Sequence, residues 1–209
     1  MTLNALVVDV GIGNLRSVAK ALETAGEGSV AVTRSRDPDA VRKAERIVVP
    51  GQGGFSACAA PLQGGLAEAL REAVGRGVPY LGICLGLQVL FESSEEAPGV
   101  PGLGWFRGEV KRLERTPGLK IPHMGWNQLD LEHGGHPHLD AAGGAGTWVY
   151  FVHSYHAVPS DPELLRATVS YGPNTVTAAV SRDNVFATQF HPEKSQAAGL
   201  LLLKSFLKR

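Results

Sequence analysis

Residues 78–88 read VPYLGICLGLQ, which runs from an apolar segment into a helical one through two closely spaced glycines. Val78–Ile83 is predicted to form a buried strand and Gly86–Glu92 a helix. A nucleophile between two glycines at such a junction is typical of a nucleophile elbow, because glycine permits a sharp turn. Cys84 is therefore expected to stand exposed at the carboxyl end of the strand, near the positive end of the helix. The alternative is that Cys84 is a small buried residue that ends the strand.

Strands and helices alternate on the amino-terminal side of this stretch. Strands are predicted at Leu3–Asp9, Val30–Thr33 and Arg46–Val49. Helical spacing begins at Leu15 and stops near Gly26, Asp37 and Pro38 are typical of a helix start, and one apolar helix face spans Leu66–Val74. This alternation predicts a mainly parallel sheet with helices on both faces.

From about Gly104 the pattern changes to strands joined by short turns. These strands are predicted at Phe106–Leu113, Trp148–Val158, Leu165–Ser170, Val176–Ser181 and Val185–Phe190. A final helix carries Leu200, Leu203, Phe206 and Leu207. The segments Ser93–Gly102 and Glu132–Gly146 are expected to be loops, and neither has the character of a domain linker. We therefore expect one domain over residues 1–209.

Composition excludes several classes of function. The formal net charge is zero and no basic stripe occurs, which argues against a nucleic-acid partner. The longest strongly apolar run, Leu200–Leu203, is far too short to span a bilayer, and the first residues do not form a signal peptide. The chain has 2 cysteines, Cys58 and Cys84, too few for a disulfide framework. A cytosolic protein with both thiols free is expected, Cys58 being a packing residue.

A second motif, Gln189-Phe190-His191-Pro192-Glu193, follows a predicted strand. A thiol nucleophile needs a base, and the base is usually oriented by a third group. Residues two apart in an extended segment share a face, and Pro192 disfavours helical geometry at His191. His191 and Glu193 are therefore candidates for the base and its orienting carboxylate. A surface turn at a strand end is the alternative for this motif taken alone.

A third motif, Val48-Val49-Pro50-Gly51-Gln52-Gly53-Gly54-Phe55, ends another predicted inner strand. Attack on an amide builds an oxyanion, which needs preorganised N–H donors. The backbone at Gln52 and Gly53, together with the N–H of Leu85, is predicted to supply them. A phosphate-binding loop is a rival interpretation, but no Gly-Lys-Ser/Thr ending is present. A plain turn is the other alternative.

Taken together, these motifs resemble those of the class I, or triad, glutamine amidotransferases. The resemblance covers essentially the whole chain, as one glutamine amidotransferase type 1 domain with a flavodoxin-like, three-layer α/β/α fold. It implies that Cys84 is the nucleophile, His191 the base and acid, and Glu193 the orienting carboxylate. Gln88 matches the glutamine that ends the family's Gly-Ile-Cys-Leu-Gly-x-Gln run. It lies one helical turn after Cys84, where it would touch the substrate. No metal or organic cofactor is expected.

A closer resemblance is to the glutaminase subunits of imidazole glycerol phosphate synthases. It rests on residues 9–15, 121–127, 150–155 and 191–195. It implies that Ser154 and Tyr155 line the glutamine pocket and that ammonia leaves near Tyr150. Asn14, Trp126 and Lys194 would face the cyclase subunit, a (β/α)8 barrel, in a heterodimer. Ammonia would there yield imidazole glycerol phosphate and an aminoimidazole carboxamide ribotide, in histidine biosynthesis.

One departure and two rivals accompany this resemblance. After Pro50-Gly51 the family pattern has Val, Gly and Ala, whereas this chain has Gln52-Gly53-Gly54, and adjacent glycines predict a looser oxyanion loop. The rivals are the glutaminase subunit of another pathway, such as anthranilate or pyridoxal phosphate synthesis, and a relative that binds glutamine without catalysis. His133, His136 and His138 are crowded, but a glycine-rich loop is favoured there over a metal site.

Overall fold

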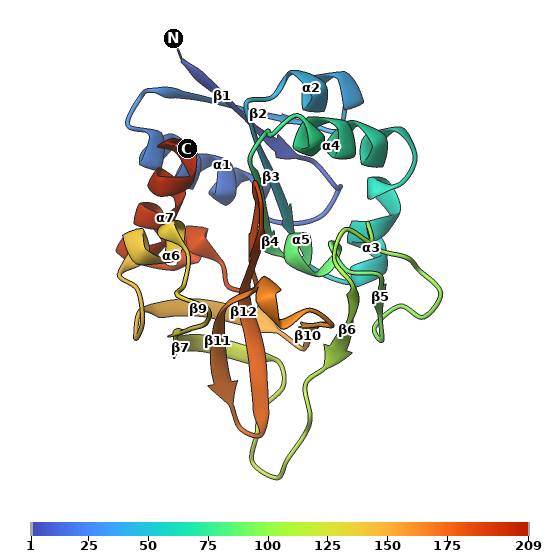
Figure 1. The fold of residues 1–209 in the computed structure, drawn as a ribbon, viewed down its shortest axis with the longest axis vertical. Coiled ribbons are helices and arrows are strands. Elements are labelled where there is room, and N and C mark those ends of the chain that lie inside the picture. The colour runs from blue at the N-terminus through green and yellow to red at the C-terminus, as the bar shows by residue number, and fades with distance from the viewer. Residues whose placement is uncertain (1, 209) are drawn as a thin grey trace.

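A central sheet of eight strands runs through the protein, for which a computed structural model describes residues 2–208 (Figure 1). In spatial order its strands are β2 (Val30–Ser35), β1 (Leu3–Val8), β3 (Arg46–Gly51), β4 (Tyr80–Cys84), β13 (Val185–Thr188), β12 (Asn174–Arg182), β11 (Leu165–Tyr171) and β8 (Asp130–Leu131). The strands from β2 to β13 are parallel to their neighbours, and the remaining three pair antiparallel. The predicted mostly parallel sheet is confirmed.

Helices cover both faces of this sheet, as Figure 1 shows. One face carries α1 (Leu15–Gly26), α6 (Pro137–Ala142) and α7 (Gln196–Lys208), packed around Leu22, Leu203 and Phe206. The other carries α2 (Pro38–Lys43), α3 (Phe55–Ala59), the short η1 (Ala60–Leu62), α4 (Gly65–Gly75) and α5 (Leu85–Gln88), packed around Phe55, Leu70 and Tyr80. The three-layer α/β/α architecture is confirmed.

Burial on both faces explains the continuous apolar runs of the inner strands. In β1, Leu6 and Val8 face one hydrophobic core, whereas Ala5 and Val7 face the other. Helix starts follow local capping, and the predicted cap at Asp37 is confirmed, since its carboxylate accepts the N–H of Asp39.

Two smaller sheets flank the antiparallel end of the central sheet. One contains β10 (Tyr155–Pro159), β6 (Gly108–Arg112) and β5 (Ser93–Ser94), and the other pairs β7 (His123–Gln128) with β9 (Trp148–His153). The prediction of one strand over Trp148–Val158 is therefore wrong. The chain breaks at Ser154, because β9 pairs with β7 while β10 pairs with β6. Two further short turns of helix are η2 (Pro162–Leu164) and η3 (Pro192–Lys194).

Two other local predictions are also wrong. The helix predicted over Gly86–Glu92 ends at Gln88, because the carbonyls of Val89 and Leu90 accept the N–H groups of Leu103 and Phe106 instead of continuing the helix. The loop predicted over Glu132–Gly146 contains α6, which His136 caps through its Nδ1 and Pro137 begins.

None of the helices described between residues 2 and 208 combines the length and the apolar character that crossing a membrane requires.

Candidate active site

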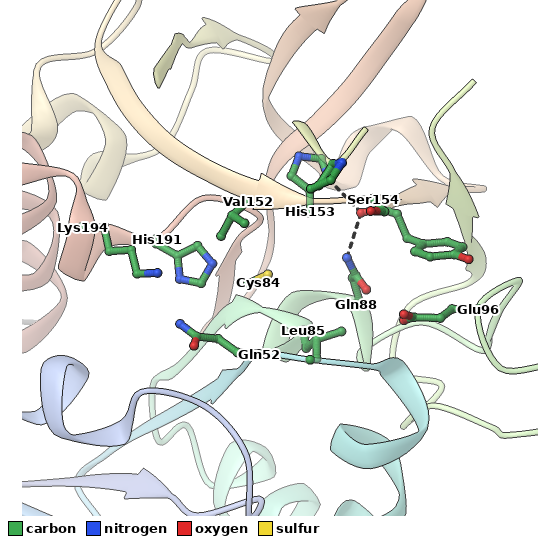
Figure 2. A pocket seen from close by; sticks show the side chains of 13 residues that line it. Gln52, Cys84, Leu85, Gln88, Glu96, Val152, His153, Ser154, His191 and Lys194 are labelled. Atoms are coloured by element: carbon green, nitrogen blue, oxygen red, sulfur yellow. Dashed lines mark hydrogen bonds between the residues drawn. The ribbon is translucent and has the colours of Figure 1, made fainter. Parts of the chain in front are cut away.

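A cavity of about 370 Å³ opens where β3, β4 and β13 end (Figure 2). Most of the predicted site residues line it, namely Gln52, Gly53, Cys84, Leu85, Gln88, Ser154, Tyr155, His191 and Lys194. Segments that lie far apart in the sequence therefore meet at one edge of the sheet. This is the edge at which open α/β sheets bind ligands.

Cys84 occupies a sharp turn between β4 and α5. Its backbone has φ 55° and ψ −104°, a conformation that residues with side chains rarely adopt. Two glycines make the turn possible. A Cβ at Gly82 would lie 2.4 Å from the carbonyl oxygen of Gly86, and a Cβ at Gly86 would lie 1.8 Å from that of Val49. The predicted exposure of Cys84 is wrong, because the residue is only 5% exposed and its sulfur faces the cavity.

His191 and Glu193 form a buried pair beside Cys84. His191 Nδ1 lies 2.8 Å from Glu193 Oε1, and the two side chains are 1% and 0% exposed. The prediction of one extended segment through Glu193 is wrong. His191 is extended, with φ −101° and ψ 98°, but Glu193 lies in η3, so a turn brings the two side chains together. The turn at Pro192 brings the carboxylate of Glu193 next to Nδ1 of the imidazole.

The other imidazole nitrogen, Nε2, is buried and has no hydrogen-bond partner among residues 2–208. Figure 2 shows the His191 ring directed toward the sulfur of Cys84. Burial lowers the pKa of His191, but the negative charges of Cys84 and Glu193 outweigh burial and raise it from 6.5 to about 10. At neutral pH the imidazole of His191 is therefore protonated, and it lies beside the sulfur of Cys84.

The segment that carries His191 is held by β9. The N–H of His191 donates to the carbonyl of Tyr150 at 2.9 Å, and the N–H of Tyr150 donates to Ser195 Oγ at 3.0 Å. Ser195 Oγ in turn donates to the carbonyl of His191 at 2.7 Å. The position of the imidazole is thus tied to the backbone of Tyr150.

The glycine-rich segment after β3 lies directly across from the nucleophile. Gly51 pairs with Cys84 in the sheet register, so Gln52 and Gly53 follow at the rim of the cavity, and Leu85 lines it on the other side. Gly53 has φ 97°, which favours glycine. The backbone on both sides of Cys84 is therefore available to face a developing oxyanion.

Gln88 and the break at Ser154 form the far wall. Gln88 Nε2 donates to the carbonyl of Tyr155 at 2.9 Å, whereas Gln88 Oε1 is buried with no partner in the described part of the chain. The strand break turns Ser154 and Tyr155 toward the cavity.

Sequence reasoning missed several residues at this site, among them Glu96 and Gln189. Glu96 lines the cavity and accepts the N–H of Phe55 at 2.8 Å. Gln189 Nε2 donates to Cys84 Sγ at 3.4 Å from a fully buried position. The only sequence signal for Gln189 was its place two residues before His191, and Glu96 had none.

Of the residues predicted to face a partner, Lys194 lines the cavity. Trp126 is 41% exposed and packs edge-on against Tyr150 with ring centroids 6.0 Å apart. Lys194 Nζ lies 5.7 Å from the centre of the Tyr150 ring. Asn14 is also exposed, but its side chain caps α1 by accepting the N–H of Ser17 at 3.2 Å.

No group of three or more side chains suited to hold a metal ion occurs between residues 2 and 208. His133, His136 and His138 form no such group.

Comparisons with known proteins agree with this geometry. The family model for glutamine amidotransferase class I matches residues 6–208. The chain is 50% identical over 205 residues to the imidazole glycerol phosphate synthase subunit HisH of Thermosynechococcus vestitus, covering 96% of this chain and 94% of that one. It is 49% identical over 213 residues to the subunit of the same name from Rhodospirillum rubrum, covering 99% of each. Among solved structures, a chain of PurLQS from Thermotoga maritima has the same fold, with a TM-score of 0.75, 24% identity and coverage of 100% and 99%.

Proposed function

Because the chain belongs to the class I glutamine amidotransferase family, we propose that it is the glutaminase subunit of an imidazole glycerol phosphate synthase. It hydrolyses the side-chain amide of glutamine and delivers ammonia to a partner subunit. One observation carries the proposal: Cys84 and a buried His191–Glu193 pair meet at a single cavity. They do so in a chain about half identical to subunits with that name.

Cys84 acts as the nucleophile and His191 as the proton carrier. The thiolate of Cys84 attacks the amide carbon, and the carbonyl oxygen becomes an oxyanion that the backbone N–H groups of Gly53 and Leu85 face. The imidazolium of His191 donates its proton to the leaving nitrogen, so the C–N bond breaks and ammonia departs. A glutamyl thioester remains on Cys84. Neutral His191 then takes a proton from water, whose oxygen attacks the thioester and releases glutamate.

Glu193 acts through His191. Its carboxylate accepts the Nδ1–H of the imidazole, which leaves Nε2 directed at the sulfur and the substrate. The carboxylate is buried, so its charge stabilises the imidazolium in a site with little water.

The far wall fits a free amino acid. Glutamine carries a cationic ammonium group, and Glu96 places a carboxylate in the cavity wall. Gln88 lines the same wall, and Ser154 and Tyr155 close it from the strand break. These residues would select an amino acid over a simple amide.

We define the outer face as the exposed side of the β7–β9 pair, formed by Met124, Trp126, Gln128, Trp148, Tyr150 and Val152. Sheet register places these residues opposite one another, and Met124, Trp126 and Trp148 are 61%, 41% and 54% exposed. Large apolar side chains gathered on one exposed face are typical of a protein-binding surface. This face receives the cyclase subunit, a (β/α)8 barrel, to form a heterodimer.

The outer face also adjoins the cavity. Val152 belongs to both, and Lys194 lines the cavity while it approaches the ring of Tyr150. Ammonia released at Cys84 would leave past Tyr150 toward the docked barrel, with Asn14 at the margin of the contact.

The experiment for this proposal is to co-express the chain with the cyclase subunit of the same organism. We expect one complex in which glutamine yields glutamate and imidazole glycerol phosphate in equal amounts. Trp126→Ala should weaken the complex by about 2 kcal/mol, because truncated aromatic anchors lose contacts of this size. Leu201→Ala, a 48% exposed apolar residue on α7, is the control and should bind like wild type.

If the chain does not bind this cyclase but binds another synthase and supplies it with ammonia, the proposed pathway is wrong. Unchanged affinity in Trp126→Ala would contradict the placement of the interface.

A further inference from the structure

Two buried histidines have no part in the proposed chemistry. His123 and His153 are 2% and 6% exposed, and His123 Nδ1 lies 3.1 Å from His153 Nε2. The ring of His123 stacks with those of Phe151 and Tyr171, with centroids 4.7 and 4.0 Å away. Both histidines lie on the inner side of the β7–β9 pair, opposite the outer face.

The hydrogen bonds of this pair define which nitrogen carries each proton. His153 Nδ1 lies 2.9 Å from the carbonyl oxygen of Tyr155, which can only accept, so Nδ1 carries the proton. Burial lowers the pKa of His153 to about 3 and that of His123 to about 4, so both rings are neutral at pH 7. His153 Nε2 must then accept from His123 Nδ1–H. The remaining nitrogen of His123 faces Asn127 Nδ2 at 3.5 Å, a donor at the long limit of a hydrogen bond.

The same carbonyl of Tyr155 is connected to the nucleophile through the side chains of two glutamines. It also accepts from Gln88 Nε2, and Figure 2 shows the two bonds converging on it. Gln88 Nε2 donates its second hydrogen to Gln189 Oε1 at 3.0 Å, and Gln189 Nε2 donates to Cys84 Sγ at 3.4 Å. A continuous series of hydrogen bonds thus joins β7 to the sulfur.

From the Tyr155 carbonyl to the sulfur, each bond fixes the orientation of the next amide, while the histidines hold the other side of that carbonyl. The carbonyl of Tyr155 is an acceptor, so Gln88 must present its NH₂ group there. Gln88 then donates its second N–H to Gln189, which must accept it with Oε1. Gln189 is left with its NH₂ group toward the sulfur, where a donor stabilises a thiolate. A flip at either amide would set two donors or two acceptors against each other.

We propose that these side chains form a positioning relay, consisting of His123, His153, Gln88 and Gln189, which holds the Cys84 sulfur in the orientation for attack. The inference rests on the proposed glutaminase function and adds residues that act on the nucleophile without touching the scissile bond. Because His123 lies behind the outer face on β7, the relay begins at the strand that carries Trp126.

A matched pair of substitutions at His123 separates the relay from simple packing. His123→Phe keeps a ring between Phe151 and Tyr171 but removes the Nδ1–H donor. His123→Asn loses the ring but keeps an amide N–H near the position of Nδ1. If His123 acts in the relay, His123→Phe should lower activity more than His123→Asn. If His123 only packs, His123→Asn should lower activity more.

The measurement is glutamine turnover by the complex with the cyclase subunit. We expect His123→Phe to lower kcat about tenfold, the rate equivalent of one hydrogen bond, with KM for glutamine within about twofold of wild type. His123→Asn should retain most of kcat. Gln189→Met, which removes the donor to the sulfur at similar volume, should lower kcat in the same way. Each variant should also slow alkylation of Cys84 by iodoacetamide in proportion to its loss of kcat.

Wild-type kcat in His123→Phe, or a greater loss in His123→Asn, would overturn the relay. If His123→Phe does not fold, Gln189→Met decides the matter, and unchanged alkylation of Cys84 would be contrary evidence. Failure of the proposed function is distinguishable, because the wild-type complex would then release no glutamate from glutamine.

Discussion

At the residue scale, the backbone of Cys84 is strained where the chemistry needs it to be. A residue other than glycine at φ 55° and ψ −104° is typically destabilised by about 1–3 kcal/mol, and the surrounding structure must hold it there. Gly82 and Gly86 allow the close backbone contacts that do so. The strain aims the thiol into the cavity, toward His191.

The residues around Cys84 differ in how far the sequence could predict them. Cys84, His191 and Glu193 occur in short motifs that together resemble those of a known family, and this resemblance predicted their roles. Gln189 and Glu96 could not be predicted, because their positions depend on segments brought together only by folding. The relay was even less predictable from the sequence, because the orientation of Gln88 depends on the carbonyl of Tyr155, 67 residues away in the chain.

The neutral histidine pair should make the protein sensitive to acid. Burial lowers the pKa of His123 from 6.5 to about 4, so the unfolded chain binds a proton that the folded chain excludes. This stability is present above pH 6.5 and is lost as the pH falls through 6.5 toward 4. As the pH falls through this range, the free energy of unfolding should decrease less steeply in His123→Asn than in the wild type. The two slopes should differ by up to about 1.4 kcal/mol per pH unit.

Urea unfolding at several pH values between 6.5 and 4 measures this difference. Parallel pH profiles for wild type and variant would show that His123 has the same pKa in the folded and the unfolded protein. The donor directions assigned to the pair would then be wrong.

At the element scale, the junction of β4 and α5 depends on close backbone contact. The strand and the glycine turn could be predicted from the sequence, but the length of α5 could not. The helix stops at Gln88 because residues 102–106 take up the next carbonyls, a contact that no local pattern signals.

Gly86→Ala should destabilise the protein by about 3 kcal/mol or more, since overpacking against backbone leaves little room to adjust. The added Cβ would lie 1.8 Å from the carbonyl oxygen of Val49. Gly75→Ala is the matched control. Its Cβ meets nothing within 4 Å, and it lies in α4, so it should be neutral or stabilise by up to about 1 kcal/mol.

Urea unfolding of the two variants gives the comparison directly. If Gly86→Ala proved as stable as Gly75→Ala, the elbow would tolerate a wider turn than its contacts indicate.

At the scale of the whole molecule, the site lies where two kinds of sheet meet. The parallel strands supply Cys84 and the segments that hold Gln52 and His191, while the two smaller sheets supply Ser154 and Tyr155. Alternating apolar strands and helices predicted the three layers, because burial on both faces leaves a clear pattern. The division of residues 148–158 between two sheets could not be predicted, since it depends on pairing with β7 and β6.

The outer face and the cavity share Val152, whose side chain points toward Cys84 and His191 in Figure 2. Tyr150 anchors the segment of His191 through its backbone and contributes its ring to the outer face. A docked partner would therefore contact the strand that holds the base. If a partner docks on this face as proposed, ammonia released in the cavity would have a short path to it.

The proposed role of Cys84 is to release ammonia from glutamine for use by the partner subunit. The most direct test is the rate of imidazole glycerol phosphate formation by the complex, measured for Cys84→Ala with glutamine and, separately, with ammonium salts. We expect the variant to lose glutamine-dependent synthesis, because no thioester can form, and to keep the wild-type rate with ammonium. Glutamine-dependent synthesis near the wild-type rate in Cys84→Ala would contradict the account.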